Sequence, residues 1–419
     1  MHVKLGIIGL GARAETLLAS LVYLQDKATV TAICDLQPER IAKIQNILTN
    51  KKMPAAKSYT NYKELIQNPE VDAVIIPTSW NSHLKIACYA MEHQKYAAIE
   101  VGGASSIQEL WDLVRASEKT GVSCMMLENC CYGRDELLVE NLVRQGLLGE
   151  LVHCECGYEH DILEEIIGGY RNGMEPAIKD NNINRGVERG IHNCHRNGDL
   201  YPTHGLGPIA KILDINRGNR FLTLSSFASK ACNFNNEAVK QGLSQHFNEG
   251  DVITSVITCA NGETITLNHS VSLPRPYSRR GHVQGTLGLW SEDHNAVFIQ
   301  GVSPTREEID PAGNPYTVHE WTPMDAMYKK HDHPIWKEYR ENTRGGHGGV
   351  DFLTLQAYFD AIERKAETPI NVYDCAAWMS VTVLSEQSIA MGGTPVSFPD
   401  FTDGTWISRT FHQDSIWSI

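Results

Sequence analysis

The sequence predicts an α/β protein with an N-terminal Rossmann domain, built on a doubly wound parallel sheet, and a C-terminal α+β domain with a mostly antiparallel open sheet. Three observations support this prediction. Short apolar runs alternate with helical patterns up to about residue 130. A glycine-rich turn follows the first apolar run. Beyond residue 130 most segments are β-rich. We therefore expect domains at 1–130 and 131–419, with the closing helices within 351–391.

The first domain is predicted to alternate strictly between strand and helix. Its strands are apolar runs, as expected for parallel strands buried on both faces. They are expected at 3–8, 30–34, 71–76, 96–101 and 123–127, with helices at 13–24, 38–48, 83–93 and 107–119. Pro38 suits the first turn of a helix. This order of elements specifies a parallel sheet with crossover helices.

The second domain is predicted to begin with a helix and continue mainly as strands. The helix is expected at 135–145, the strands at 151–158, 221–228, 252–259 and 263–271, and two final helices at 351–365 and 374–390. Asn261-Gly262 predicts a two-residue hairpin turn. Residues 168–190 are rich in glycine, asparagine and charge, which favours a long loop covering the site. His192 and His195 lie in a stretch that also reads as loop.

Composition excludes several classes of function. The 419 residues carry a formal net charge of -13, which argues against nucleic acid or an anionic membrane as partner. No apolar run is long enough to span a membrane. Eleven cysteines, an odd number, favour reduced thiols in a cytoplasmic enzyme, and export by a signal outside this sequence stays open. The cysteines lack zinc-ligand spacing, so no metal is expected.

The first turn carries a dinucleotide-binding fingerprint. In Gly9-Leu10-Gly11-Ala12-Arg13-Ala14, the glycines allow a tight turn and let backbone N–H groups approach a pyrophosphate at a helix N-terminus. Alanine takes the third glycine position. Asp35 ends the second strand, where its carboxylate would accept hydrogen bonds from ribose hydroxyls and repel a 2′-phosphate. The alternative is an ordinary turn and a surface aspartate. The pattern favours NAD over NADP, with Gly9, Gly11, Ala12, Arg13 and Asp35 in the site.

Two further strand ends extend the match to a family. The third strand leads to Thr78-Ser79-Trp80-Asn81-Ser82-His83 and the fourth to Glu100-Val101. Here the chain resembles the Gfo/Idh/MocA oxidoreductases, whose strands lead to Thr-Pro-x-x-x-His and Glu-Lys-Pro. Ser79 replaces the proline, and Val101 replaces the lysine that those dehydrogenases use in catalysis. The resemblance implies their two-domain architecture and a nicotinamide site lined by Trp80, Asn81, His83, Glu100, Val101, Asn129 and Tyr201.

Longer motifs narrow the resemblance. Tyr201-Pro202-Thr203-His204, within 197–208, and Gly345-Gly346-His347-Gly348-Gly349 look like glycoside hydrolase family 109, as do 125–129 and 215–218. The known activity there is mainly that of an α-N-acetylgalactosaminidase. The resemblance implies a redox route: NAD⁺ oxidises the sugar at C3, the C2 proton is removed, the C1–O bond is expelled, water adds, and hydride returns.

That route implies roles for particular side chains. His204 is expected near O3, Tyr201 near both nicotinamide and sugar, and His347 on a glycine-rich loop that brings it into acid–base work at C1 or C2. Tyr158, Arg189, Tyr201, His204 and Tyr277 match the substrate-contacting positions. Their structural alternatives are plain. Among 17 histidines most serve structure, and aromatic residues on strands usually pack. The division of acid and base roles among Tyr201, His204 and His347 stays open.

Two other functions compete with a glycosidase. An NAD-dependent sugar dehydrogenase would be expected to keep the lysine that Val101 replaces. An NAD-sensing protein without activity would need only the cofactor site, so Tyr201, His204 and His347 count against it. The partner expected is a small carbohydrate, and the resemblance implies a homodimer through the exposed sheet face of the second domain. The sugar and its anomer are left open.

Overall fold

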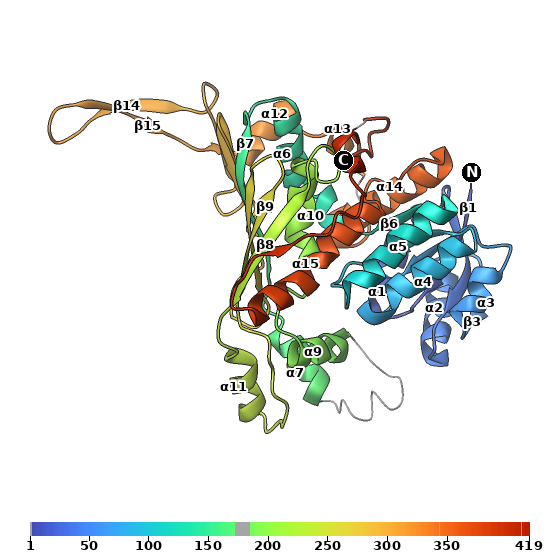
Figure 1. The fold of residues 1–419 in the computed structure, drawn as a ribbon. Helices are drawn as coiled ribbons and strands as arrows, with labels where there is room; N and C mark the ends of the chain where they lie inside the picture. The colour runs from blue at the N-terminus through green and yellow to red at the C-terminus, as the bar shows by residue number, and fades with distance from the viewer. Residues whose placement is uncertain (1, 172–184, 343, 412) are drawn as a thin grey trace.

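Two β-sheets carry the fold, and helices pack around and between them (Figure 1). The computed structural model describes residues 2–171, 185–342, 344–411 and 413–419. In the described part of the chain no helix is long and apolar enough to cross a membrane. All eleven cysteines are free thiols.

The N-terminal sheet has six strands in the order β3-β2-β1-β4-β5-β6, and every neighbouring pair is parallel. The strands are β1 (Val3–Ile8), β2 (Ala28–Cys34), β3 (Lys57–Tyr59), β4 (Ala73–Ile76), β5 (Tyr96–Ile99) and β6 (Cys124–Met126). Their helices are α1 (Ala12–Leu21), α2 (Pro38–Asn50), α3 (Tyr62–Gln67), α4 (Trp80–Glu92) and α5 (Ile107–Thr120). The strand order reverses between β1 and β4, where Rossmann folds bind nucleotides. The predicted doubly wound sheet is confirmed, with β3 and α3 as additions.

The second sheet has nine strands in the order β16-β13-β12-β11-β7-β10-β9-β8-β17. They are β7 (Leu151–Glu159), β8 (Phe221–Ala228), β9 (Ile253–Cys259), β10 (Thr264–Ser270), β11 (His282–Gly285), β12 (Gly288–Ser291), β13 (Ala296–Ile299), β16 (Thr322–Pro323) and β17 (Val396–Ser397). Neighbouring strands are antiparallel except for β7 and β10, which run parallel. The sheet is therefore mixed, and mostly antiparallel as predicted.

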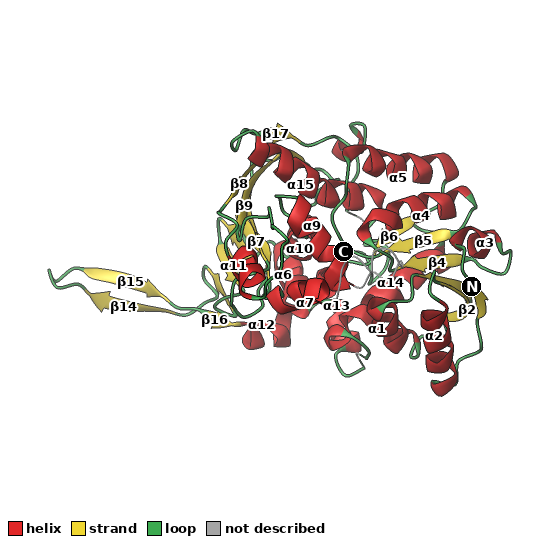
Figure 2. Cartoon of the chain, turned by 90° about the horizontal axis from the view of Figure 1, so that it is seen from below, coloured by secondary structure: helices red, strands yellow, loops and turns green. Residues whose placement is uncertain are grey.

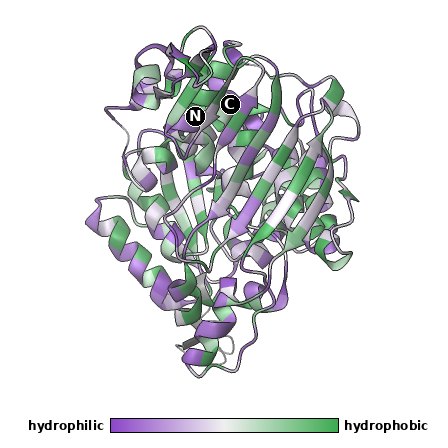
Figure 3. Cartoon of the chain, turned by 90° about the vertical axis from the view of Figure 1, so that its left-hand side faces the viewer, coloured by the Kyte–Doolittle hydropathy of each residue, from purple (hydrophilic) through white to green (hydrophobic). Residues whose placement is uncertain are grey.

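Helices cover one face of this sheet and leave the other open. Figure 3 looks onto the open face, where the strands lie in front of the helices. β9 shows the pattern: Ile253, Ser255, Ile257 and Cys259 are buried, while Thr254, Val256 and Thr258 on the other face are partly or fully exposed. The helices of this half are α6 (Arg134–Arg144), α7 (Leu163–Arg171), α9 (Arg185–His195), α10 (Thr203–Ile212), α11 (Asn233–Lys240), α12 (Met324–His331), α13 (Pro334–Tyr339), α14 (Val350–Arg364) and α15 (Val372–Ala390), with 3₁₀ turns at Asn129–Tyr132, His347–Gly349 and Thr405–Ile407.

One hairpin departs from the body of the molecule. Strands β14 (Thr305–Ile309) and β15 (Pro315–His319) pair only with each other and project outward as an arm (Figures 1 and 2). Nearly every residue of both strands is exposed. The sequence analysis did not predict this arm, because its residues are polar and lack the burial pattern of a sheet strand.

The structure corrects three predictions of local structure. The loop predicted at 168–190 is helical at both ends: α7 continues to residue 171 and α9 begins at 185, while 172–184 lie outside the described residues. His192 and His195 are therefore helical, because Val187, Ile191 and Cys194 recur at helical spacing despite the nearby glycines. Helix α4 begins at Trp80, earlier than expected.

The β9–β10 turn also differs from the prediction. Cys259 and Glu263 are hydrogen-bonded across it, so the turn has three residues instead of two. Gly262, with φ of 100°, takes the left-handed conformation that such a turn needs.

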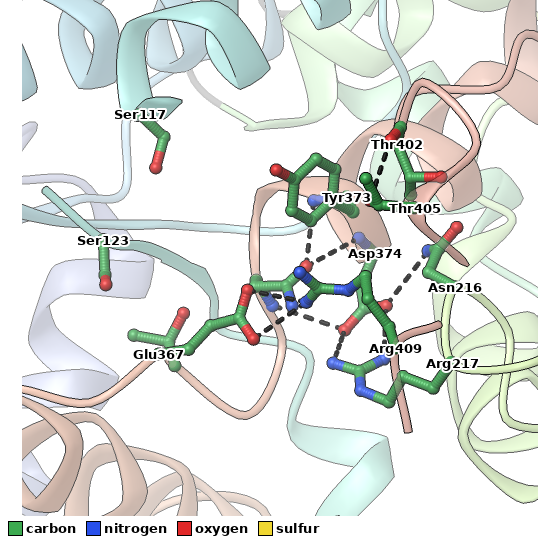
Figure 4. Close-up of polar contacts among 12 residues, drawn as sticks. Ser117, Ser123, Asn216, Arg217, Glu367, Tyr373, Asp374, Thr402, Thr405 and Arg409 are labelled. Carbon is green, nitrogen blue, oxygen red and sulfur yellow. Dashed lines mark hydrogen bonds and ion pairs between the residues drawn. The ribbon is translucent and has the colours of Figure 1, made fainter. Parts of the chain in front are cut away.

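A buried ion cluster fixes the start of α15, which packs across β8 and α5 (Figure 4). Asp374 accepts hydrogen bonds of 2.9 Å from both Nη atoms of Arg217 and lies 3.4 Å from Nζ of Lys211. Burial alone would raise the pKa of Asp374, but the two cations hold it well below its usual range. Asn371 completes a capping box with Asp374. Further along α15, Ser385 Oγ accepts the Asp199 N–H at 2.9 Å, so the helix also supports the segment that carries Tyr201.

We predict that Asp374→Asn lowers the free energy of unfolding by about 3–5 kcal/mol, because two buried cations lose their counter-charge while the side chain keeps its size. Urea unfolding measures the change. Asp360→Asn is the control, since Asp360 pairs with Arg364 on the surface of α14 and should cost about 1 kcal/mol or less. Equal losses in the two variants would contradict the prediction.

Candidate active site

The nucleotide end of the site lies where β1 meets α1. Gly9 has φ of 95°, and a Cβ there would come within 2.8 Å of Thr78 Cγ2. A Cβ on Gly11 would meet nothing within 4 Å, and no side chain caps α1 at Gly11. The helix N-terminus is therefore accessible to a pyrophosphate group. Nearby, Thr78 Oγ1 and both ring nitrogens of buried His83 have no hydrogen-bond partner among the described residues. These features fit a bound dinucleotide.

Asp35 lies at the end of β2 and closes the turn from the other side. Its carboxylate accepts the N–H of Leu10 at 2.7 Å and the N–H of Gln37 at 2.9 Å, and Arg40 lies 3.7 Å away. Asp35 is 8% exposed. A carboxylate held in this way keeps lone pairs for ribose hydroxyls, as the sequence analysis expects.

Arg13, in the fingerprint, joins the two halves of the chain. Its Nη atoms donate to both oxygens of Asp351 at 2.9 and 3.0 Å, and its Nε donates to Glu100 at 2.7 Å. The Asp351 carboxylate is fully buried at the start of α14 and also accepts from Asn129 Nδ2 at 2.8 Å. Burial raises the pKa of Glu100, which Arg13 opposes, whereas His347 and Arg13 together hold the pKa of Asp351 far below its usual range.

The glycine-rich loop around His347 lies against α1. A Cβ on Gly345 would meet Ser20, and a Cβ on Gly346 would meet Thr16 and Asp351. His347 has φ of 51° and bonds Asp351 through Nδ1 at 2.8 Å, with its side chain 58% exposed. Its contacts are with Arg13 and Asp351, on the nucleotide side. The acid–base role at C1 or C2 stays a prediction for His347.

Trp80 links the nucleotide side to a second, aromatic side of the site. Its ring lies against Gly102, just after Glu100 and Val101, since a Cβ on Gly102 would fall 2.4 Å from the indole. The ring centroid is 5.7 Å from that of Tyr201 and 5.0 Å from that of His192. Asn81, the next residue, is exposed and accepts from Ser105 Oγ at 3.1 Å.

Tyr158 and Tyr201 form the centre of the aromatic side. Their ring centroids lie 4.6 Å apart, and the guanidinium of Arg189 lies 4.7 Å from the Tyr201 ring. Burial raises the pKa of Tyr201 well above its usual value, against the charge of Arg189, so its phenol stays protonated at neutral pH. Trp80, Tyr158, Arg189 and Tyr201 line one pocket. Three of the predicted substrate-contacting residues are thus brought together.

His204 stands beside them and has a carboxylate partner. Its Nδ1 lies 2.8 and 2.9 Å from the two oxygens of Glu128, and its ring centroid is 4.8 Å from that of Tyr201. Glu128 is fully buried; burial alone would raise its pKa, but His204 lowers it. A carboxylate on one ring nitrogen fixes the tautomer, leaving the other nitrogen for a substrate proton. Cys130 also lies near this pair, within the 4.8 Å spread of the three ligand atoms.

Glycine makes this arrangement possible. Helix α10 meets β7 at Gly205 and Gly157, where a Cβ on Gly205 would fall 2.4 Å from the Gly157 backbone. This close approach brings His204, next to Gly205, beside Tyr158, next to Gly157; their ring centroids are 5.5 Å apart.

Tyr277 lies at the rim of the site. It is 44% exposed, and its ring meets His160 edge-on at 5.0 Å and Tyr158 at 6.1 Å. The Tyr158 hydroxyl is 3.0 Å from His160 Nδ1. The rim therefore places Tyr277 within reach of a ligand bound against Tyr158.

Two carboxylates of the site were missed by the sequence analysis. Glu128 lies two residues after the end of β6. Polar residues at the carboxyl ends of parallel strands are candidates for a site, so that position was the available signal. Glu188, in α9, accepts the backbone N–H of Trp80. Burial raises the pKa of Glu188 to about 7, against the effects of that hydrogen bond and Arg189. No signal pointed to Glu188, because α9 was read as loop.

Comparison with known proteins finds a family match for each half of the chain. Residues 132–408 match the family model described as glycosyl hydrolase 109, C-terminal domain. The chain belongs to glycosyl hydrolase family 109. Residues 3–128 of this family 109 protein match the model described as oxidoreductase family, NAD-binding Rossmann fold. The Gfo/Idh/MocA resemblance and NAD as cofactor are thereby confirmed.

Curated relatives extend over nearly the whole chain. An α-N-acetylgalactosaminidase of Tannerella forsythia is 39% identical over 424 residues, covering 97% of this chain and 88% of the relative. Another of that name, from Shewanella oneidensis, is 36% identical and covers 96% and 86%. These matches support glycosidase activity in the family 109 protein.

Solved structures share the fold at low identity. Myo-inositol 2-dehydrogenase from Lactobacillus plantarum has a TM-score of 0.64 at 15% identity, covering 95% of this chain and all of that one. Levoglucosan dehydrogenase has a TM-score of 0.66 at 16% identity and covers 96% and 100%. The predicted fold class is confirmed.

We predict that Glu128→Gln lowers kcat for glycoside hydrolysis about 100-fold, because His204 loses the carboxylate that fixes its tautomer. Steady-state kinetics at pH 7 measures the effect. Glu140→Gln is the matched control, as Glu140 is equally buried but pairs with Arg144 in α6 and should leave kcat within about twofold. An unchanged kcat in the Glu128 variant would contradict a role for the pair.

Proposed function

We propose that this chain is an NAD-dependent α-N-acetylgalactosaminidase that works by oxidation, elimination, addition and reduction. The observation that carries the proposal is the pairing of His204 with Glu128 beside two tyrosines, at the end of a site that begins with a dinucleotide turn. The substrate comes from the relatives, two of which are named α-N-acetylgalactosaminidase. Most glycosidases use two carboxylates instead, and the NAD-dependent route is a known exception.

The cofactor and the protein divide the work. Gly9, Gly11, Arg13 and Asp35 would hold the dinucleotide, and Trp80 lies between its end of the site and the aromatic side. When bound, NAD supplies a hydride acceptor for sugar C3 and the hydride that restores it, so the cycle has no net oxidation. The remaining steps are cleavage of the C1–O bond, addition of water and the proton transfers that accompany them, which the side chains must perform.

His204 accepts the O3 proton as C3 is oxidised and returns it at the end of the cycle. Glu128 stabilises the imidazolium formed in between. The C3 ketone acidifies the C2 proton. A base accepts this proton, the C1–O bond breaks, and the leaving oxygen takes up a proton; water then adds at C1 as a proton returns to C2. Tyr201, kept protonated by burial, is suited to donate a hydrogen bond to the sugar. Arg189, between Trp80 and Tyr201, adds a fixed positive charge where enolate charge develops.

A sugar dehydrogenase remains the second candidate because the solved structures similar to this fold include dehydrogenases. Val101 argues against it. This residue is 6% exposed and apolar, in the position where the resemblance expects a catalytic lysine. His204 with Glu128 supplies a base in its place. A sensor would not need such a pair.

The first experiment uses p-nitrophenyl α- and β-glycosides of GalNAc, GlcNAc, Gal and Glc in D₂O. We expect nitrophenol release from the α-GalNAc substrate and one deuterium at C2 of the released sugar. We expect no accumulation of NADH, which is followed by its absorbance. Deuterium enters because the C2 proton is exchanged with solvent between elimination and addition. Accumulating NADH without nitrophenol would identify a dehydrogenase, and release without deuterium would exclude the elimination route.

We also propose that two copies of the chain pair through the open face of the nine-stranded sheet. The face carries β-branched residues such as Thr254, Val256, Thr258, Thr264 and Thr266. The nine strands hold 47 residues. At about 3.3 Å of strand per residue and about 4.8 Å between strands, they cover a flat area of roughly 750 Å². That area is what one partner buries in a standard stable interface.

Val256→Glu should convert a dimer into a monomer, because it places a charge within the paired faces. Size-exclusion chromatography with light scattering measures the mass. Val239→Glu, on exposed helix α11, is the control and should leave the mass unchanged. A monomeric wild type would contradict the pairing.

A further inference from the structure

A buried group of charges lies directly behind the aromatic side of the site. His269, in β10, is 2% exposed, and Asp199 and Glu249 are each 1% exposed. The Nε2 of His269 lies 3.0 Å from Glu249 Oε1, and its Nδ1 lies 3.5 Å from Asp199 Oδ1. The imidazole is thus held between two carboxylates, and neither proton transfer nor cofactor binding as described above uses any of the three.

Each member of this group touches the site by a different route. His269 pairs with Tyr158 in the parallel register of β10 and β7, and their rings stack at 6.2 Å with an interplanar angle of 22°. Asp199 accepts the backbone N–H of Tyr201 at 3.1 Å. His269 itself lines the same pocket as Tyr158, Arg189 and Tyr201.

Glu249 extends the group to helix α9. Its second oxygen accepts from Asn193 Nδ2, and the Asn193 carbonyl accepts the N–H groups of residues 248 and 249 at 3.1 Å. Asn193 lies one helical turn after Arg189, so both project from the same side of α9. The contacts therefore join helix α9, which carries Arg189, to β10, the neighbour of the strand that carries Tyr158.

We propose that Asp199, His269 and Glu249 form a buried ion triad that positions Tyr158, Tyr201 and Arg189 for the reaction. With all three ionised the triad carries one net negative charge, which opposes the charge of buried Arg189 nearby. These are positioning residues: they act through the tyrosines and the arginine without touching the sugar. This inference rests on the proposed function of the site.

The titration of the group supports this geometry. Burial alone would lower the pKa of His269, but Glu249 and Asp199 raise it, so the imidazole is held in its charged form. Burial raises the pKa of Asp199 to about 6, against the effects of His269 and the Tyr201 N–H, and with a further increase from Glu249. Arg189 lowers the pKa of His269. Below about pH 6 Asp199 becomes protonated, and the triad loses its net charge.

The test is His269→Gln, compared with wild type in kcat and KM for the hydrolysed glycoside between pH 5 and 9. Without the imidazolium, the pKa of Asp199 rises further, so the acidic limb of the kcat profile should move up by about one pH unit. Loss of the positioning of Tyr158 and Tyr201 should in addition lower kcat at pH 7 about tenfold. In His269→Gln the carboxylates of Asp199 and Glu249 have lost the imidazolium. The double variant Asp199→Asn/His269→Gln removes the carboxylate that titrates and should abolish the shift of the acidic limb of the kcat profile. His331→Asn, a buried histidine in α12 that bonds Gln145, is the control and should change neither.

A purely structural role predicts a lower melting temperature with the kcat profile unmoved, and that result would overturn the proposal. If His269→Gln does not fold, Glu249→Gln serves, because its amide can still accept from Asn193 while the charge is lost; an unshifted profile in this variant also contradicts the triad. A wild type inactive on every glycoside contradicts the proposed function, whereas an active wild type with an unchanged His269→Gln contradicts the triad alone.

Discussion

The ion pair between Arg13 and Asp351 is the contact on which the geometry of the site depends. Arg13 comes from the first turn of α1, and Asp351 from the start of α14, more than three hundred residues later. The carboxylate is fully buried, so it must be paired, and Arg13, His347 and Asn129 all converge on it. Because α14 is thereby held against α1, the nucleotide turn and the glycine-rich loop form one wall of the site.

The opposite wall of the site, formed by His204 and Tyr158, depends on the close approach of the backbones of α10 and β7. Gly205 at the start of α10 meets Gly157 of β7 with no room for a Cβ. A larger residue at either position would separate His204 from Tyr158, whose rings now meet at 5.5 Å. One wall is thus fixed by charge and the other by close packing, and Trp80 spans the distance between them through its contacts with Gly102 and Tyr201.

Paired charges recur throughout the site for one physical reason. Exclusion of water from a buried place makes every unpaired charge there costly. Glu128 is paired with His204, Glu100 with Arg13, and Glu249 with His269. Each pair offsets the cost of burying a charged group at the site or directly behind it.

The sequence by itself determined the features that short-range patterns encode. These are the alternation of strands and helices in the Rossmann half, the dinucleotide turn with Asp35, and the motifs around Tyr201 and His347. Each is encoded within a few residues, so periodicity and spacing suffice. Helix α9 was missed because its glycines outweighed the spacing of Val187 and Cys194. Only the tertiary structure decided the partners. Glu128 and His204 are 76 positions apart, and His269 reaches Asp199 and Glu249 through strand register and loop return. Such pairs form because folding brings both members together in the interior, and local sequence patterns do not show which distant residues will be neighbours.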